Sequence, residues 1–325
     1  MVAVSEKDDF CIYCYDFDGQ GKAINAKDSG VSNDAFLTWW HLDALNPDTE
    51  SFLHETIGLN PIITGALLAQ DTRPRLEQFE NGLLIILRGI NTENPEQPED
   101  MISVRIWIDA ERVITVRRRV LMSIRDLVDR IERGLPPHTG GDLLCYLIDR
   151  LTQRISPVID TLEERCDTLE GALIDEPNRA LRTQIIQTRK KAITLRRYLG
   201  PQRDVLSQLR NQDFEDLSTQ NKWQLQEYSS YSLRLVEDLD MLRERTQIIQ
   251  DELTTALADA LNRNMYMLSV IAAIFLPLGF LTGLLGINVG GIPGSENPHA
   301  FWIFAGGLVI LILCQILLFK KAKWF

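Results

Sequence analysis

The sequence predicts an α+β protein in three parts: a mixed α/β domain at residues 1–140, a helical stalk at 141–263 and two membrane-spanning helices within 264–325. Three observations support this prediction. Short apolar runs alternate with turn signals up to about residue 140, and helical patterning follows almost to the hydrophobic region. No charged residue occurs from Asn264 to Ser295.

The N-terminal part contains five apolar runs that are short and rich in β-branched or aromatic residues, which is typical of strands. They occupy residues 10–17, 36–43, 82–91, 103–110 and 112–118. A helical segment at 55–69 separates two of them, and a polar loop is expected at 91–101. This arrangement indicates a mixed α/β domain.

From Asp142 onward the pattern is helical, and breaks are expected at 175–178, 199–202 and 211–220. The last helix should begin near Ser218 or Thr219 and continue into the hydrophobic region, a length of roughly 100 Å at ~1.5 Å per residue. Such a helix needs partners along its apolar side, and we expect other copies of the chain to supply them. The apolar side consists of Leu235, Leu239, Leu242, Ile249, Leu253, Leu257 and Leu261.

Acidic residues recur along the same helix. One line contains Glu237, Glu244 and Asp251, and a neighbouring line contains Asp238, Glu252 and Asp259. In several copies these lines would form an acidic vestibule. The alternative is a solvated charged face, because arginines 243, 245 and 263 lie among the carboxylates.

Two uncharged segments are long enough to cross a bilayer, which requires ~20 apolar residues. They are residues 265–287 and 300–319, and the alternative is a pair of buried core helices. Arg263 precedes the first span and lysines at 320, 321 and 323 follow the second. The positive-inside rule therefore places residues 1–263 and the tail 320–325 in the cytoplasm and the loop 288–299 outside.

Charge and cysteine content limit the possible functions. The net charge of −11 divides into +2 for residues 264–325 and −13 for residues 1–263, which argues against nucleic-acid binding and suits the attraction of cations. Five scattered cysteines and a charged N-terminus without an apolar signal peptide indicate a reducing cytosol. The sequence contains none of the motifs G-x-S-x-G, Walker A or H-E-x-x-H, so no enzymatic activity is expected.

The pair Cys11 and Cys14 forms a C-x-x-C motif within a predicted strand. Residues three apart in a strand point to opposite faces, so the sulfurs would converge only at a turn or bulge. Packing in the core is therefore expected in place of a zinc or redox site.

The segment LLGINVGGIPG, residues 284–294, ends the first span with glycines and a proline. A helix must stop there, and non-helical backbone at membrane depth persists only where it lines water or packs on protein. Asn288 is therefore a candidate for the mouth of a pore. The alternative is a simple hairpin turn in which the asparagine adopts a positive φ angle.

The segment NRNMYMLSVIAAIFLPLGFLTGLLGIN at 262–288, with its short loop and second span, resembles the C-terminus of the CorA family of divalent-cation transporters. That family carries a G-[M/I]-N motif after its first span. GINVGGIPG and the terminal KKAKWF resemble the zinc-transporting branch, ZntB, more than the magnesium channels with YGMN. Weaker similarity at 71–88 and 112–119 extends the resemblance over essentially the whole chain.

This resemblance implies a funnel-shaped homopentamer in the bacterial inner membrane, with the long helix and first span around an axial pore and the second span outside. The outer entrance would consist of Gly286, Ile287 and Asn288. The residues that the resemblance places along the pore, where most are three or four positions apart as one helical stripe requires, are Asp251, Asn262, Met265, Leu268, Ala272 and Leu276.

A ring of Asn288 amides would hydrogen-bond the water shell of a cation without trapping the ion. The first span contains no Cys, His or carboxylate, so zinc would not be stripped of water within it. The expected cargo is Zn²⁺, with Cd²⁺, Ni²⁺ or Co²⁺ as further candidates, and no cofactor is expected. Met265 and Leu268 are candidates for an apolar constriction, with helix packing as the alternative.

The zinc branch implies coupling of uptake to protons, yet neither span has an ionisable residue at its centre. The titratable candidates lie outside the spans: Glu296 and His299 in the loop, and Asp251 and Asp259 in the vestibule. Zinc uptake is therefore the leading hypothesis, with a magnesium channel as the alternative in the family. A membrane-tethered cytosolic sensor or scaffold is the alternative of another class.

Overall fold

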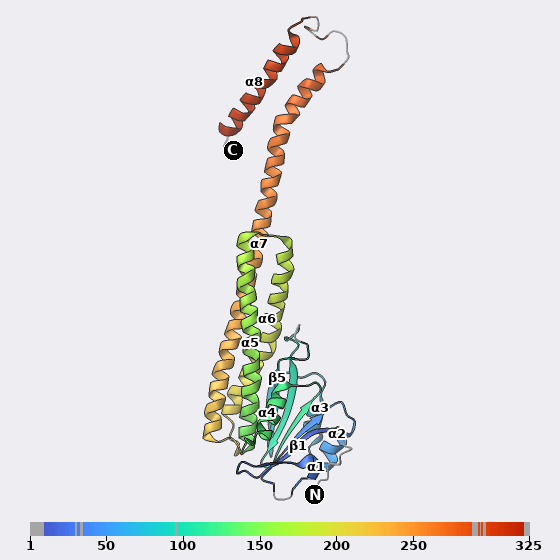
Figure 1. Ribbon diagram of the computed structural model, residues 1–325, viewed down its shortest axis with the longest axis vertical. Coiled ribbons are helices and arrows are strands. Elements are labelled where there is room, and N and C mark those ends of the chain that lie inside the picture. Colours follow the sequence, from blue (N-terminus) through green and yellow to red (C-terminus); the bar gives the residue numbers. More distant parts are fainter. Residues whose placement is uncertain are drawn as a thin grey trace. The chain divides into compact units, whose positions relative to one another are not determined.

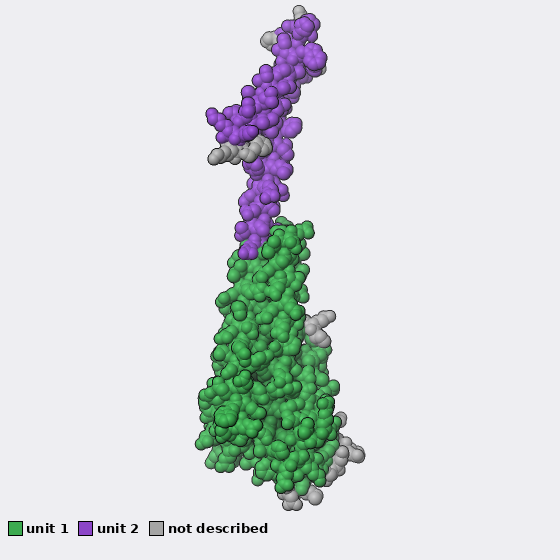
Figure 2. Space-filling view, turned by 60° about the vertical axis from the view of Figure 1, so that its left-hand side comes forward, with its two compact units in different colours: residues 1–251 green, residues 252–325 purple. Residues whose placement is uncertain are grey.

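The computed structural model describes residues 10–29, 31–32, 35–94, 97–287, 292, 294 and 297–321. The chain forms two compact units, Met1–Asp251 and Glu252–Phe325, which Figure 2 colours separately. One helix, α7 (Thr219–Leu285), contributes residues to both units. Its 67 residues confirm the prediction of a long helix that continues into the first hydrophobic span.

A seven-stranded sheet forms the centre of the first unit, in the order β2-β1-β3-β7-β6-β5-β4. Its strands are β1 (Cys11–Phe17), β2 (Ala23–Asn25), β3 (Leu37–Asp43), β4 (Arg75–Phe79), β5 (Gly82–Gly89), β6 (Ile102–Asp109) and β7 (Arg112–Arg117). β3 and β7 pair in parallel, and the other neighbours are antiparallel. The five predicted strands are confirmed. The two edge strands were missed because β2 has three residues and β4, RLEQF, is mostly polar.

Each face of the sheet supports its own hydrophobic cluster, because successive side chains in a strand point to opposite faces. Trp39 packs toward α4 (Met122–Glu132), α5 (Gly140–Asp175) and α6 (Arg179–Arg210), with Leu127, Leu147 and Leu206 in that cluster. Trp40 packs with Phe52 on the other face. That face carries α1 (Ala26–Ser29), α2 (Asp48–Ser51), a short π-helix (Phe52–Thr56) and α3 (Pro61–Leu68), as Figure 1 shows.

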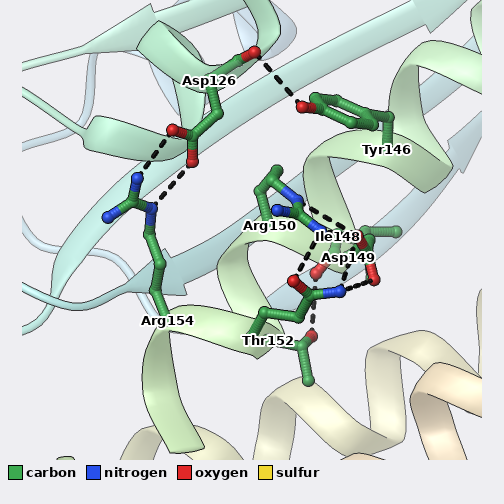
Figure 3. A network of polar contacts seen from close by, with 8 residues as sticks. Asp126, Tyr146, Ile148, Asp149, Arg150, Thr152 and Arg154 are labelled. Atoms are coloured by element: carbon green, nitrogen blue, oxygen red, sulfur yellow. Dashed lines mark hydrogen bonds and ion pairs between the residues drawn. The ribbon is translucent and has the colours of Figure 1, made fainter. Parts of the chain in front are cut away.

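Polar contacts join α4 to α5 at one edge of the helical layer (Figure 3). Arg154 donates two hydrogen bonds to the Asp126 carboxylate, at 2.8 and 2.6 Å, and the Tyr146 hydroxyl donates to the Asp126 carbonyl at 3.2 Å. One turn away, Arg150 pairs with Asp149 at 2.6 Å. The bidentate geometry at Asp126 orients α4 against the buried face of α5.

The breaks predicted at 175–178 and 211–220 are confirmed, since α5 ends at Asp175 and α6 ends at Arg210. The break predicted at 199–202 is wrong, because α6 continues through Pro201. Proline removes one backbone hydrogen bond, but tertiary contacts hold the helix here. Leu199 and Val205 are buried, and the Gln202 side chain accepts a hydrogen bond of 2.7 Å from the backbone N–H of Arg88.

The partners of α7 differ from the prediction along its first half. Leu235, Leu239, Leu242 and Ile249 are buried in the single chain, so other copies are not needed to cover them. Hydrogen bonds from Arg245 to Glu170 on α5 and from Arg196 on α6 to Asp240 join α7 to helices of its own chain. Further along, Leu261 is exposed and remains without such cover.

The start of α5 packs closely against the connection between α6 and α7. Thr139 caps α5 by accepting a hydrogen bond from the Asp142 backbone N–H, and Asn221 of α7 donates to the Asp142 carboxylate at 2.9 Å. A Cβ atom added at Gly141 would lie 2.8 Å from Asn221 Oδ1 and still closer to the Asp216 carbonyl. Glycine is therefore required at this position for contact between the two segments.

Gly141→Ala is expected to destabilise the protein by about 1–3 kcal/mol, the usual cost of overpacking. Gly171→Ala, in the same helix, has open space around the new methyl group and should be stabilising by up to ~1 kcal/mol through helix propensity. Thermal unfolding of the purified variants measures both effects. Equal melting temperatures for the two variants would contradict the close packing at Gly141.

The same connection holds a carboxyl group with a perturbed pKa. Burial, together with the nearby charges of Asp109, Glu215 and Asp142, raises the pKa of Asp216 from 3.8 to about 6. Its Oδ2 atom is buried and has no hydrogen-bond partner within the described residues. Ionisation of Asp216 is therefore unfavourable in the folded state.

Because this pKa is higher in the folded than in the unfolded chain, Asp216 contributes stability below its unfolded pKa that is lost as pH rises to about 6. Asp216→Asn keeps the group neutral. Its melting temperature should exceed that of the wild type by a margin that grows from about pH 4 to about pH 6 and then levels off. Asp213→Asn, an exposed change in the same connection, serves as the control. A margin independent of pH would refute the assignment.

Candidate ion pathway on helix α7

The second unit contains the end of α7 and α8 (Ala300–Lys321), both long and apolar enough to cross a membrane. Only 6% and 0% of their most apolar windows are buried. The core helix of a soluble protein would be mostly buried, so these helices have the exposure expected of membrane spans. The first predicted span, 265–287, ends two residues after the end of α7. The second, 300–319, begins with α8 and ends two residues before α8 does.

The predicted pore residues lie along one side of α7. At ~100° per residue, all six fall within about 120° of one another around the helix axis. Met265, Leu268 and Leu276 are 66%, 68% and 74% exposed, and Asp251, Asn262 and Ala272 are exposed as well. We call these six residues the α7 stripe.

The α7 stripe points away from α8. Gln315 of α8 donates a hydrogen bond to the backbone carbonyl of Ala273 at 3.4 Å, so this side of α7 faces α8. Val270, one turn below on a neighbouring side, is buried, in contrast to the exposed residues of the stripe. The spans of one chain therefore leave the stripe uncovered.

Within the membrane span the stripe offers no Cys, His or carboxylate, and its polar groups, the Asn262 amide and the Asp251 carboxylate, lie before the span. Among the described residues, no group of three or more His, Cys, Asp and Glu could hold a metal ion. The local hydrogen bonds are satisfied within the helix; Ser269 donates to the Met265 carbonyl at 2.8 Å and Thr282 to the Leu278 carbonyl at 2.9 Å. This surface can pass an ion only if the ion keeps water around it.

Of the charged side chains on α7 before the first span, some form ion pairs with α5 and others are exposed. Arg245 forms ion pairs with Asp167 at 2.5 Å and Glu170 at 2.8 Å, and these partners raise its pKa. It therefore faces α5 and does not neutralise the acidic lines of α7. Burial and then the charge of Glu237 raise the pKa of Asp238. Asp251 accepts a hydrogen bond from Gln247, and Asp259 is exposed.

The outer end of α7 is described only in part. The backbone N–H of Gly286 donates to the Thr282 carbonyl at 2.9 Å, Ile287 is exposed, and the His299 N–H donates to the Asn297 side chain at 2.9 Å. Asn288 and Glu296 lie outside the described residues. The functions predicted for the entrance residues and for the two loop residues remain predictions; these residues are Gly286, Ile287, Asn288, Glu296 and His299.

A bulge in β1 brings the two cysteines of the C-x-x-C motif to the same side of the sheet. The register between β1 and β3 shifts between Cys11 and Tyr13, and this bulge places Cys11 and Cys14 in the same buried cluster. A hydrogen bond from Cys11, followed by burial, raises the pKa of Cys14. Both thiols are fully buried, so the expectation of core packing is confirmed.

The sequence alone did not single out Gln315, which joins the two spans. Pro277 lies inside α7 and has no N–H, so the carbonyl of Ala273, four residues earlier, lacks its usual helical donor. Gln315 donates to that carbonyl from α8. A proline in the first span and a lone amide in the second were the available signal. Because lipid cannot hydrogen-bond a free carbonyl, this contact should help to hold the spans together.

Gln315→Leu should therefore lower stability, whereas in a Pro277→Ala background, where α7 regains its own donor, the same change should have little effect. The expected coupling is about 0.5–2 kcal/mol. Unfolding of the four proteins in one detergent measures it. Additive effects of the two substitutions would show that Gln315 does not act on the Ala273 carbonyl.

Comparison with known proteins agrees with this geometry. Residues 34–321 match the family described as "CorA-like Mg2+ transporter protein". The "Zinc transport protein ZntB" of Yersinia enterocolitica is 34% identical over 313 residues, covering 96% of this chain and 95% of that protein. The "Divalent cation transporter CmaX" of Pseudomonas aeruginosa is 36% identical over 292 residues, covering 88% and 87%.

Among solved structures, full-length CmaX aligns with a TM-score of 0.83 at 35% identity, over 97% of this chain and 98% of that one. The CorA magnesium transporter of Methanocaldococcus jannaschii aligns with a TM-score of 0.82 at 21% identity, over 97% and 99%, and supports the fold alone. These relatives are ion transporters and not enzymes, as the sequence predicts. Because the family match covers most of its length, this chain belongs to the CorA-like Mg2+ transporter family.

Proposed function

We propose that this protein carries divalent cations, zinc in preference, across the bacterial inner membrane through the axial pore of a homopentamer. The observation that carries the proposal is the α7 stripe, an exposed side of a membrane-spanning helix that turns away from the other span of its own chain. The relatives named for zinc transport and for divalent-cation transport support the choice of cargo. Cd²⁺, Ni²⁺ and Co²⁺ are further candidates, and magnesium is the alternative cargo within the family.

Assembly with other copies is required, because two spans of one chain cannot enclose a channel. α7 offers a second uncovered surface for this assembly: Trp223, Met241 and Ile248 are exposed and lie on one side of the helix. The number five rests on the family resemblance. In this proposal residues 1–140 and 141–263 form the cytoplasmic domain and stalk, and residues 264–325 form the membrane domain.

The pathway would recognise a hydrated ion. Gly286, Ile287 and Asn288 would form the outer entrance, where amide dipoles hydrogen-bond the water shell of the ion. Met265 and Leu268 are exposed and apolar, as a constriction that closes by dewetting requires. At the cytoplasmic side, Asp251 and Asp259 would attract the cation.

Uptake coupled to protons would need titratable groups along this path. Glu296 and His299 beyond the first span, and Asp251 and Asp259 before it, are the candidates. With both termini in the cytoplasm, the first pair would face the outside and the second pair the inside. Protonation of either pair would change the local charge that an entering or leaving cation meets.

Asn288→Ala tests the pore. In proteoliposomes, uptake of radioactive zinc should fall at least about tenfold if the amide ring orders the water shell of the ion, since each lost hydrogen bond weakens the site in every subunit. Val309→Ala, an exposed change on α8, is the matched control and should transport normally. Unchanged uptake in Asn288→Ala would instead favour a membrane-tethered sensor or scaffold.

The same vesicles distinguish the cargo and the coupling. Zinc uptake that persists in excess magnesium supports zinc, and its loss supports a magnesium channel. An imposed pH gradient should alter the rate if protons are coupled, and indifference to the gradient would reject coupling.

A further inference from the structure

We propose that a cavity in the first unit binds a small organic anion with an apolar body, such as an aryl phosphate or aryl carboxylate. The cavity has a volume of about 460 Å³ and lies between the segment that follows β5, the middle of α5 and the middle of α6. This volume is in the range of small-molecule sites. None of the α7 stripe residues lines it, so the inference is independent of the ion pathway.

Asn91 supplies an unsatisfied donor at this cavity. Its side chain is 1% exposed, and its Oδ1 accepts hydrogen bonds from the backbone N–H groups of Glu93 at 3.1 Å and Asn94 at 3.3 Å. Those two bonds fix which end of the amide is oxygen. The Nδ2 group is shielded from solvent and has no hydrogen-bond partner within the described residues, so a small shift of the side chains around it would let a ligand oxygen accept its hydrogen bond.

The charges around the cavity favour an anion. Arg165 of α5 and Lys191 of α6 line it, and Glu99 is the carboxylate of the lining. Lys191 Nζ lies 3.6 Å from Glu99 Oε2, which is beyond hydrogen-bond distance, and that oxygen has no hydrogen-bond partner in the part of the chain described. Arg165 is exposed and forms no ion pair with the described residues. The lining therefore has a net charge of +1, with the Arg165 guanidinium available to a phosphate or carboxylate.

The remaining walls would hold the apolar body. Pro157 and Val158 of α5 form one side, Leu195 of α6 forms another, and Leu162 and Leu195 are buried. A rigid apolar group in this space would contact α5, α6 and the segment after β5 together. Binding should therefore raise the melting temperature of the protein, because only the folded chain offers these three walls at once.

The test uses the full chain in amphipol and 1-naphthyl phosphate as the probe, with bound probe measured by equilibrium dialysis. Saturable binding is expected in the wild type, accompanied by a rise in melting temperature. Arg165→Gln should weaken binding at least about fivefold, the loss of one charge-assisted contact. Arg182→Gln removes an exposed arginine of α6 that does not line the cavity, and it should bind like the wild type.

Thr161→Trp, at an exposed position of the lining, should fill the cavity and abolish binding while its own melting temperature confirms that it folds. Inorganic phosphate alone should compete weakly, because it lacks the apolar body. Absence of saturable binding in the wild type would overturn the proposal. Equal affinity of Arg165→Gln and Arg182→Gln for the probe would also overturn it. So would inorganic phosphate that displaces the probe as strongly as unlabelled 1-naphthyl phosphate does. Zinc uptake is not a readout here, so failure of the ion pathway would leave this result unaffected.

Discussion

The structure depends on how the 67-residue helix α7 is covered along its length. A helix this long cannot be stable through intrinsic propensity alone, so packing must supply the difference. In its first half α5 and α6 of the same chain supply that packing, with Leu239 and Leu242 fully buried between the helices and the Arg245 ion pairs at the edge. Surface ion pairs contribute at most about 1 kcal/mol each, so the buried leucines dominate the association.

Beyond these leucines, α7 is no longer packed against helices of its own chain along most of its surface. Residues 264–285 are largely exposed and carry no charge, which is stable in lipid and unstable in water. In lipid the backbone becomes the constraint, because each free carbonyl is costly. Pro277 creates one such carbonyl at Ala273, and Gln315 satisfies it from α8. The kink-forming residue of one span and the polar residue of the other thus form a single structural element, and each explains why the other is tolerated.

The sequence was sufficient for the parts of the fold that rest on local pattern. Five strands, two helix breaks, the start of α7 near Thr219 and both spans follow from periodicity, capping and length. Tertiary contacts decided the remainder. Gly200 and Pro201 read as a break, but the contact between Gln202 and the Arg88 backbone holds the helix through them. The hydrogen-bond partners that join α7 to α5 and α6 lie 44 positions before Asp240 and 75 and 78 positions before Arg245, a pairing that a single sequence does not encode in any local pattern.

The candidate site also has a part that the sequence predicts and a part that depends on tertiary contacts. The positions of the α7 stripe could be predicted because the family resemblance implies them and helical spacing fits one side of a helix. Gln315 could not be predicted, since its contact appears only when α8 lies beside Pro277. The chemistry of the stripe limits any transport mechanism that uses it. Zinc held by thiolate, imidazole or carboxylate ligands would be released slowly, whereas Asn262, Met265 and Leu268 offer an amide and apolar groups. Discrimination among divalent cations along such a surface must then act on the hydrated ion, through the width of the pathway and the orientation of the water around it, and the acidic residues before the span would govern how often an ion is present.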